Sequence, residues 1–188
     1  AGVTDSILSN NTQTISATVK NEADLQVVKS SSTSNIQTNT PFSYTLATNN
    51  IGPLVVPSGD VVTVRDYPQT GIRINSVTSA VGWTCTPYLV GGMPTAFPLL
   101  GNGTNSGGNI TGTTANYVEC TRSDGLAIAS YPDIVLNAEG SVTGSRNNTA
   151  RIAATATPDT GGVVTINTAT GNNQESQSVT FTVGASLN

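Results

Sequence analysis

Short segments in which apolar residues alternate with threonine and serine recur along the chain, and this feature constrains the fold most. The clearest is Thr12–Val19, with Ile15, Ala17 and Val19 on one face. Successive side chains of a strand point to opposite faces, so this alternation predicts strands with one face against a core. No stretch of a dozen residues has the apolar spacing of three and four that an amphipathic helix needs. The sequence therefore predicts an all-β fold.

The same alternation predicts further strands in chain order: Ala23–Lys29, Phe42–Thr48, Val62–Val64, Ile72–Val77, Gly82–Thr86, Asn116–Thr121, Ile134–Leu136, Thr149–Thr157, Val163–Thr168 and Ser176–Val183. Turn-forming residues separate them, at Asn49-Asn50, Asp124-Gly125 and Gly171-Asn172-Asn173. Many short strands at regular spacing predict a sandwich or barrel. Only Pro87–Ala115, rich in glycine and proline, breaks the rhythm. It is predicted to be a long surface loop with little regular structure.

The composition indicates an exported protein. Charged residues make up 10% of the chain, against about 25% in ordinary globular proteins, and threonine, serine and asparagine supply most of the polarity. The net charge is −4 and the seven Lys and Arg residues form no cluster, so we expect no nucleic-acid partner. No apolar run reaches the roughly 20 residues that span a bilayer. The start Ala1-Gly2-Val3, without Met, is typical of a mature terminus after signal-peptide removal, or of an engineered one. We therefore expect an extracellular location at the cell surface.

Cys85 and Cys120 flank the Pro87–Ala115 loop, and the chain has no histidine. In an exported chain such a pair predicts a disulfide, with two free thiols as the alternative. A metal site would need further soft or imidazole ligands, so we expect no metal. A bond here closes a ring of about 36 residues, which the chain-entropy model values at about 3–4 kcal/mol. The bridge would hold the two flanking strands in register.

Several short motifs follow one another in a recognisable order: Ala23–Ser30, Phe42–Pro53, Val62–Asp66, Gly82–Cys85, Val118–Thr121, Asn147–Ala150, Asp159 and Asn172-Asn173. This series resembles the DUF11 repeat domain of prokaryotic cell-surface proteins. The resemblance implies an immunoglobulin-like β-sandwich, usually one unit of a surface array. This chain departs from the pattern in having one copy, a longer loop at residues 87–115 and an extra segment at residues 1–22. We expect a domain at residues 23–188 preceded by an N-terminal arm at residues 1–22.

The arm suggests how the protein works. A sandwich with an open edge can accept a strand from a neighbour, so Ile15, Ala17 and Val19 could enter the next copy. Head-to-tail repetition of that contact builds a fibre, which predicts a homopolymeric filament or pilus-like structure. The alternatives are an arm that pairs with its own sheet and an arm that is a flexible tail.

The second functional hypothesis is an adhesin or carbohydrate-binding module that uses the 87–115 loop. Tyr88, Phe97 and Tyr117 could stack on sugars there, whereas Trp83 is expected in the core. Its partners would be glycans or other surface proteins. Asn102 and Asn109 head glycosylation sequons in the same loop, as Asn10 and Asn147 do elsewhere.

Lys29 and Asn148 are a candidate pair for an intramolecular isopeptide bond. In some surface sandwiches a buried Lys attacks an Asn with help from a carboxylate, here Asp24 or Glu139. The reaction needs an apolar pocket that keeps the amine neutral. The alternative is a Lys that protects a strand edge from aggregation.

Catalysis on an external substrate has little support, and we expect neither an enzyme nor a cofactor. There is no histidine for a triad and no glycine motif for phosphates. A glycosidase-type carboxylate pair depends on the fold, which leaves that case open. The remaining aspartates are expected at turns or strand ends, with calcium binding as an alternative: Asp60, Asp66, Asp124, Asp133 and Asp159.

Overall fold

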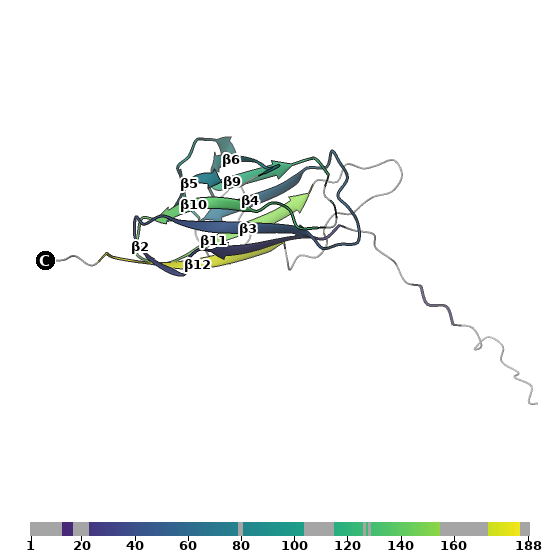
Figure 1. Ribbon diagram of the computed structural model, residues 1–188, viewed down its shortest axis with the longest axis horizontal. Coiled ribbons are helices and arrows are strands. Elements are labelled where there is room, and N and C mark those ends of the chain that lie inside the picture. The colour runs from purple at the N-terminus through teal and green to yellow at the C-terminus, as the bar shows by residue number, and fades with distance from the viewer. Residues whose placement is uncertain are drawn as a thin grey trace, which may run out of the picture.

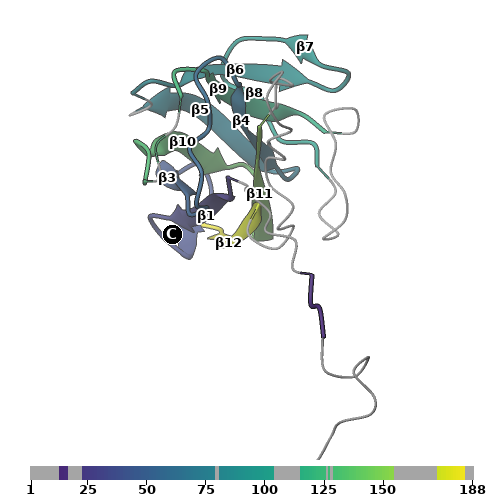
Figure 2. The same ribbon diagram turned by 90° about the vertical axis from the view of Figure 1, so that its right-hand side faces the viewer.

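A computed structural model describes residues 13–16, 23–78, 81–103, 115–125, 127, 129–154 and 173–184. Two β-sheets packed face to face make up this part of the chain, as Figures 1 and 2 show. No helix occurs among the described residues. The predicted fold class, an all-β immunoglobulin-like sandwich, is confirmed.

The first sheet has five strands in the order β1-β3-β10-β5-β8. Their bounds are Leu25–Ser31, Phe42–Asn50, Ile134–Gly140, Ile72–Thr78 and Leu99–Leu100. The second sheet has seven strands in the order β2-β12-β11-β4-β9-β6-β7. Their bounds are Asn35–Gln37, Gln174–Thr182, Gly144–Ala154, Val62–Pro68, Tyr117–Arg122, Thr84–Leu89 and Met93–Pro94. Strand β2 runs parallel to β12, and the other pairings between these strands are antiparallel.

The core fills the space between the sheets, as the alternation predicts. Every second residue of β3 is buried, so Tyr44 and Leu46 point inward with less than 2% exposure. Val179 and Phe181 of β12 lie in the same core cluster. Phe42 contacts both layers, because its ring lies 5.0 Å from the Tyr44 ring and 5.6 Å from the Phe181 ring. The predicted strand at Val163–Thr168 lies outside the described residues.

The insertion after β6 is more regular than predicted. Strand β6 continues to Leu89 and turns into β7, while Leu99 of β8 is buried and pairs with Ile74 of the other sheet. The return path passes close to β4, because a Cβ on Gly101 would lie 2.3 Å from the Gln69 carbonyl oxygen. The described part of the insertion therefore contributes to both sheets. The strands β7 and β8 have only two residues each, and the pairing of the loop with both sheets was not predicted, because a single buried leucine gives no periodic signal.

The turn predicted at Asn49-Asn50 begins after Asn50, two residues later than predicted, since both residues belong to β3. Asn50 is buried and organises the turn with its side chain. Its Oδ1 accepts hydrogen bonds from the backbone N–H groups of Asp24 and Gly52, both at 3.2 Å. Its Nδ2 donates to the Leu54 carbonyl at 2.7 Å. The residue that predicted a turn is thus the residue that stabilises it from inside.

The chain enters the sandwich at the start of β1 and leaves it at the end of β12, and these two points lie at opposite ends of the sandwich. β1 begins at Leu25, opposite Asn50 at the end of β3. β12 ends at Thr182, beside Gln37 and Thr38, just ahead of the start of β3. A nine-residue strand such as β3 spans about 30 Å. The chain therefore enters and leaves the sandwich about one strand length apart (Figure 1).

Candidate functional site

Three strands each place one polar residue on the inner face of the sandwich. In each strand every second residue points inward. Lys29 takes the inward position after two buried apolar residues of β1, and Asp66 does the same in β4. Asn148 takes the inward position before two buried apolar residues of β11. Because strand side chains alternate between faces, each of the three must point into the core. β1 belongs to the first sheet and β4 and β11 belong to the second. The three side chains therefore meet between the sheets.

The Asp66 carboxylate contacts both of the other side chains. Its Oδ1 accepts a hydrogen bond from Lys29 Nζ, and its Oδ2 accepts one from Asn148 Nδ2 at 2.8 Å. In the antiparallel ladder Asp66 pairs with Ala150, which makes Asn148 its diagonal neighbour on the same face. The Lys29 side chain is 0% exposed, Asp66 is 2% exposed and Asn148 is 0% exposed. One carboxylate thus holds an amine from one sheet beside an amide from the other, away from water.

The surroundings of Lys29 favour the uncharged amine. Burial lowers the pKa of Lys29, and the charge and hydrogen bond of Asp66 oppose that effect without cancelling it. The Tyr44 ring lies 4.6 Å from Nζ. Burial also raises the pKa of Tyr44, and the negative charge of Asp66 raises it further, which keeps the phenol neutral. Nucleophilic lysines need such a site, because only the neutral amine carries a free electron pair.

Two polar atoms in this cluster are buried without a hydrogen-bond partner. They are Asn148 Oδ1 and Tyr44 Oη. Buried polar atoms are nearly always paired in folded proteins, so each exception needs an explanation. Here the unpaired carbonyl oxygen belongs to the group that an amine would attack.

The sequence predicted the amine and the amide of this site but not its carboxylate. Lys29 and Asn148 are brought together, whereas the carboxylate that reaches them is Asp66, and neither Asp24 nor Glu139 takes this role. Glu139 lies on β10 and is half-buried, where it contacts the Arg73 guanidinium. Asp66 was expected at a turn or strand end, yet it is buried inside β4. The alternation of Val62, Val64 and Asp66 was the signal that could have identified it.

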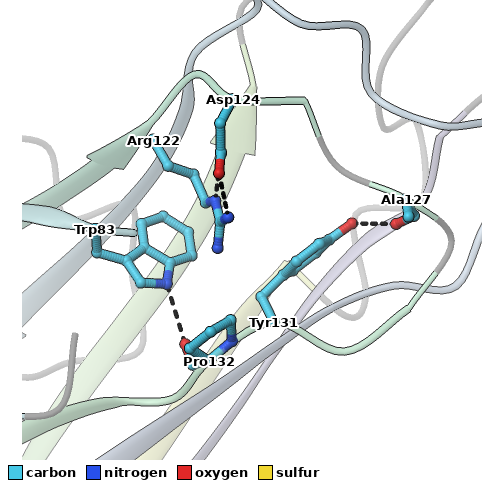
Figure 3. Close-up of polar contacts among 6 residues, drawn as sticks. All are labelled: Trp83, Arg122, Asp124, Ala127, Tyr131 and Pro132. Atoms are coloured by element: carbon cyan, nitrogen blue, oxygen red, sulfur yellow. Dashed lines mark hydrogen bonds and ion pairs between the residues drawn. The ribbon is translucent and has the colours of Figure 1, made fainter. Parts of the chain in front are cut away.

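A second polar cluster involves Arg122 and is drawn in Figure 3. The Arg122 guanidinium lies between two aromatic rings, 5.2 Å from the centre of Trp83 and 5.3 Å from that of Tyr131. It donates two hydrogen bonds to the Asp124 carboxylate, at 2.9 and 2.7 Å. Trp83 is buried and donates to the Pro132 carbonyl at 3.0 Å. The prediction of Trp83 as a core residue is confirmed, and the cluster fixes the segment between β9 and β10.

The predicted disulfide is present. Cys85 of β6 and Cys120 of β9 face each other directly in the ladder, with Cα atoms 4.0 Å apart. The bond joins neighbouring strands of one sheet at the base of the insertion. The disulfide therefore fixes the register of β6 against β9, as expected, and does not link the two sheets.

The aromatic residues proposed for sugar stacking do not form an open platform. Tyr117 is buried, and Tyr88 stacks on it with ring centres 5.1 Å apart. Phe97 is half-buried against the main core. Asn102 is exposed, with its Oδ1 accepting a hydrogen bond from the Asn116 backbone, and Asn109 lies outside the described residues.

The N-terminal arm is described only at residues 13–16. All four side chains are exposed, Ile15 by 83%, and the segment forms no strand with any described part of the chain. A strand at these positions was predicted, but it needs a partner to supply its hydrogen bonds. Ala17 and Val19 lie outside the described residues.

No group of three or more acidic, cysteine or histidine residues suited to a metal ion occurs in the described ranges. In the same ranges no helix is long and apolar enough to cross a bilayer.

Comparison with known proteins shows similarity in architecture alone. No known family model matches the chain, and no curated protein matches it. Among solved structures, a cohesin module of a Clostridium perfringens glycoside hydrolase is 8% identical, with a TM-score of 0.48 over 88% of this chain and 100% of that one. A CARDB domain from Pyrococcus furiosus is 15% identical, with a TM-score of 0.43 over 89% and 100%. A collagen-binding domain of a Staphylococcus aureus adhesin is 11% identical, with a TM-score of 0.39 over 88% and 99%. The DUF11 resemblance stays a prediction.

Proposed function

We propose that the chain is a structural domain of an extracellular surface assembly, a filament or pilus-like fibre built from copies of itself. The observation that carries the proposal is where the chain enters and leaves the sandwich, with Leu25 at one end and Thr182 at the other. Such a domain can be joined end to end with others while its sheets run along the line. The disulfide and the hydroxyl-rich, charge-poor surface support an oxidising compartment outside the cell.

Strand donation is the contact that we propose between copies. The exposed, unpaired segment at residues 13–16 offers Ile15 to a neighbour, and Ala17 and Val19 continue its alternation. An acceptor edge exists on β12. Strand β2 covers only Thr180–Thr182, so Gln174–Val179 have no described strand on the side away from β11. Open N–H and C=O groups on such an edge bind an added strand.

The adhesin alternative receives less support from the structure. Its candidate aromatic residues are buried or half-buried, and no observation in the described residues favours a sugar site. Kinship with DUF11 domains fits the proposed role in a surface array, and it rests on the sequence motifs alone.

Electron microscopy and sedimentation of the purified chain test the proposal. We expect fibres from the natural chain and dispersed particles from Ile15→Asp, because a buried carboxylate in the acceptor edge costs several kcal/mol. Val81→Asp is the matched control, since Val81 is 74% exposed on the sandwich itself. Fibres from Ile15→Asp would refute strand donation, and particles from the natural chain at high concentration would refute the fibre.

Engineered cysteines locate the contact. The natural cysteines are both in the disulfide, so a new pair reports without interference. Oxidation of Ile15→Cys/Glu175→Cys should yield a ladder of covalent oligomers. Ile15→Cys/Val81→Cys should yield no ladder beyond the background of either single variant. Equal ladders from both pairs would reject the β12 edge as the acceptor.

A further inference from the structure

We infer that the folded chain modifies itself, forming an intramolecular amide bond between Lys29 Nζ and Asn148 Cγ with Asp66 as the group that moves the protons. This activity goes beyond the proposed fibre function and does not depend on it. It would join β1 of the first sheet to β11 of the second.

Position is the first argument. Both reacting side chains contact the same carboxylate, Lys29 through Oδ1 and Asn148 through Oδ2. One carboxylate holds the amine on one oxygen and the amide on the other, so the two groups react as a fixed pair and not as separate molecules. Such positioning can remove a large part of the activation free energy. The strand ladder fixes Asp66 and Asn148 relative to each other, and only Lys29 reaches across from the other sheet.

Proton transfer from the amine to the carboxylate is the second argument. An ammonium and a carboxylate in an apolar site both lose their hydration, and moving one proton from Lys29 to Asp66 removes both charges. The Lys29 side chain is fully buried beneath the Tyr44 ring, so no water competes for the electron pair of the resulting amine. The same exclusion of water favours an amide over hydrolysis.

The reaction balances without an added reagent. The neutral Lys29 Nζ attacks Asn148 Cγ and forms the new N–C bond, while the protonated Asp66 donates a hydrogen bond to Oδ1. This donation requires a half-turn of the Asn148 amide, for which Oδ1 is available because it has no partner. A proton of the attacking nitrogen then passes by way of Asp66 to Nδ2, the Cγ–Nδ2 bond breaks and ammonia leaves. Asp66 keeps the remaining proton and hydrogen-bonds to the new amide.

An unreacted buried ion pair explains the cluster less well. Such a pair is often no more stabilising than apolar residues of similar size, because its desolvation offsets its attraction. This one also leaves the Asn148 carbonyl oxygen without a partner inside the core. The amide product removes the charges and gives that oxygen a donor. Formation of the amide bond therefore explains these contacts, whereas a purely stabilising ion pair does not.

Intact mass of the natural chain, produced alone in a heterologous host, is the primary test. We expect a mass below that of the disulfide-bonded sequence by one ammonia per molecule. Tryptic digestion locates the bond, because trypsin does not cut after a modified Lys29. The branched product should join Asn21–Arg65 to the pentapeptide Asn147–Arg151. A full mass together with free peptides Asn21–Lys29 and Asn147–Arg151 would overturn the inference.

Three variants assign the roles. Lys29→Met and Asp66→Asn should keep their full mass, the first for lack of the amine and the second for lack of proton transfer. Glu139→Gln is the matched control, since it removes a half-buried carboxylate of the other sheet, and it should lose ammonia completely. Ammonia loss in Asp66→Asn at the natural rate would refute the role of Asp66. If that variant does not fold, the natural chain's mass and branched peptide still decide whether the bond exists.

Discussion

Stretching one molecule between its ends should reveal the amide bond as a change in the length that unfolds. Tension applied at the two termini reaches the sandwich at Leu25 and leaves it at Thr182. With Lys29 joined to Asn148, the tension passes directly from one to the other. The segment between them then carries no tension, and neither does the disulfide inside it. Asp66→Asn, which keeps the size of the side chain, should restore the full path.

The two lengths follow from the covalent path. In the bonded chain about 40 residues lie in line between Leu25 and Thr182, which at about 3.5 Å each, less the roughly 30 Å of the folded sandwich, gives a gain of about 110 Å. In Asp66→Asn the path holds about 120 residues, because the disulfide bypasses those between Cys85 and Cys120. Its gain is about 400 Å by the same estimate. Segments outside the sandwich add equally to both and cancel.

Single-molecule force spectroscopy with handles on both termini measures these gains, and a reducing agent provides an internal control. Reduction should lengthen the Asp66→Asn event by about 120 Å and leave the natural chain unchanged, since its disulfide lies in the segment without tension. An event of about 400 Å in the natural chain would show that Lys29 and Asn148 are not joined. So would a natural event that lengthens on reduction, because the amide would then not enclose the disulfide.

Three further predictions concern stability in solution. In Asp66→Asn, Lys29 remains a free amine, and burial lowers its pKa from the ordinary value of 10.5. Between the pKa of the folded state and that of the unfolded state, the unfolded chain binds more protons than the folded chain. The free energy of unfolding of this variant should therefore rise as the pH increases toward 10.5. Urea titrations at several pH values should show no such rise in the bonded natural chain. Reducing the disulfide should lower the free energy of unfolding by about 3–4 kcal/mol in the same assay, and no loss would mean that the ring is already constrained. Gly140→Ala should cost about 1–3 kcal/mol by overpacking, because its Cβ would lie 2.3 Å from the Phe181 ring; an unchanged midpoint would show that the ring can move aside.

Alternation alone predicted most of the strands, because half-buried strands impose a period of two on the sequence. The same alternation gives the inward positions of the three site residues. Lys29 stands in phase with two buried residues of β1, and Asp66 and Asn148 stand in phase with those of β4 and β11. A charged residue at an inward position contradicts the core pattern, and such contradictions are expected at functional sites. The inward positions could be read from sequence, whereas which three strands face one another could not.

What the sequence left undetermined depends on contacts between distant segments. Asp24 precedes β1 and Glu139 lies on β10, and in both places the alternation of buried and half-buried residues points the carboxylate away from the core. Leu99 showed no period, since a two-residue strand is too short to have one, so its pairing with β5 was unforeseen. The arm is a different case. Its alternation predicts a strand correctly only if a partner is present, and no described part of the chain supplies one.

The location of the proposed bond follows from what already holds the sandwich together. Hydrogen bonds hold the strands of each sheet, and the disulfide adds a covalent link within the second sheet. Between the sheets side-chain packing dominates, and hydrogen bonds such as those of Lys29 with Asp66 and of Asn116 with Leu100 add directional contacts. In a fibre, tension would enter at β1, an edge strand that pairs only with β3 among the described strands. A covalent bond from β1 to an inner strand of the opposite sheet therefore reinforces this junction with a link stronger than the Lys29–Asp66 ion pair that otherwise spans it.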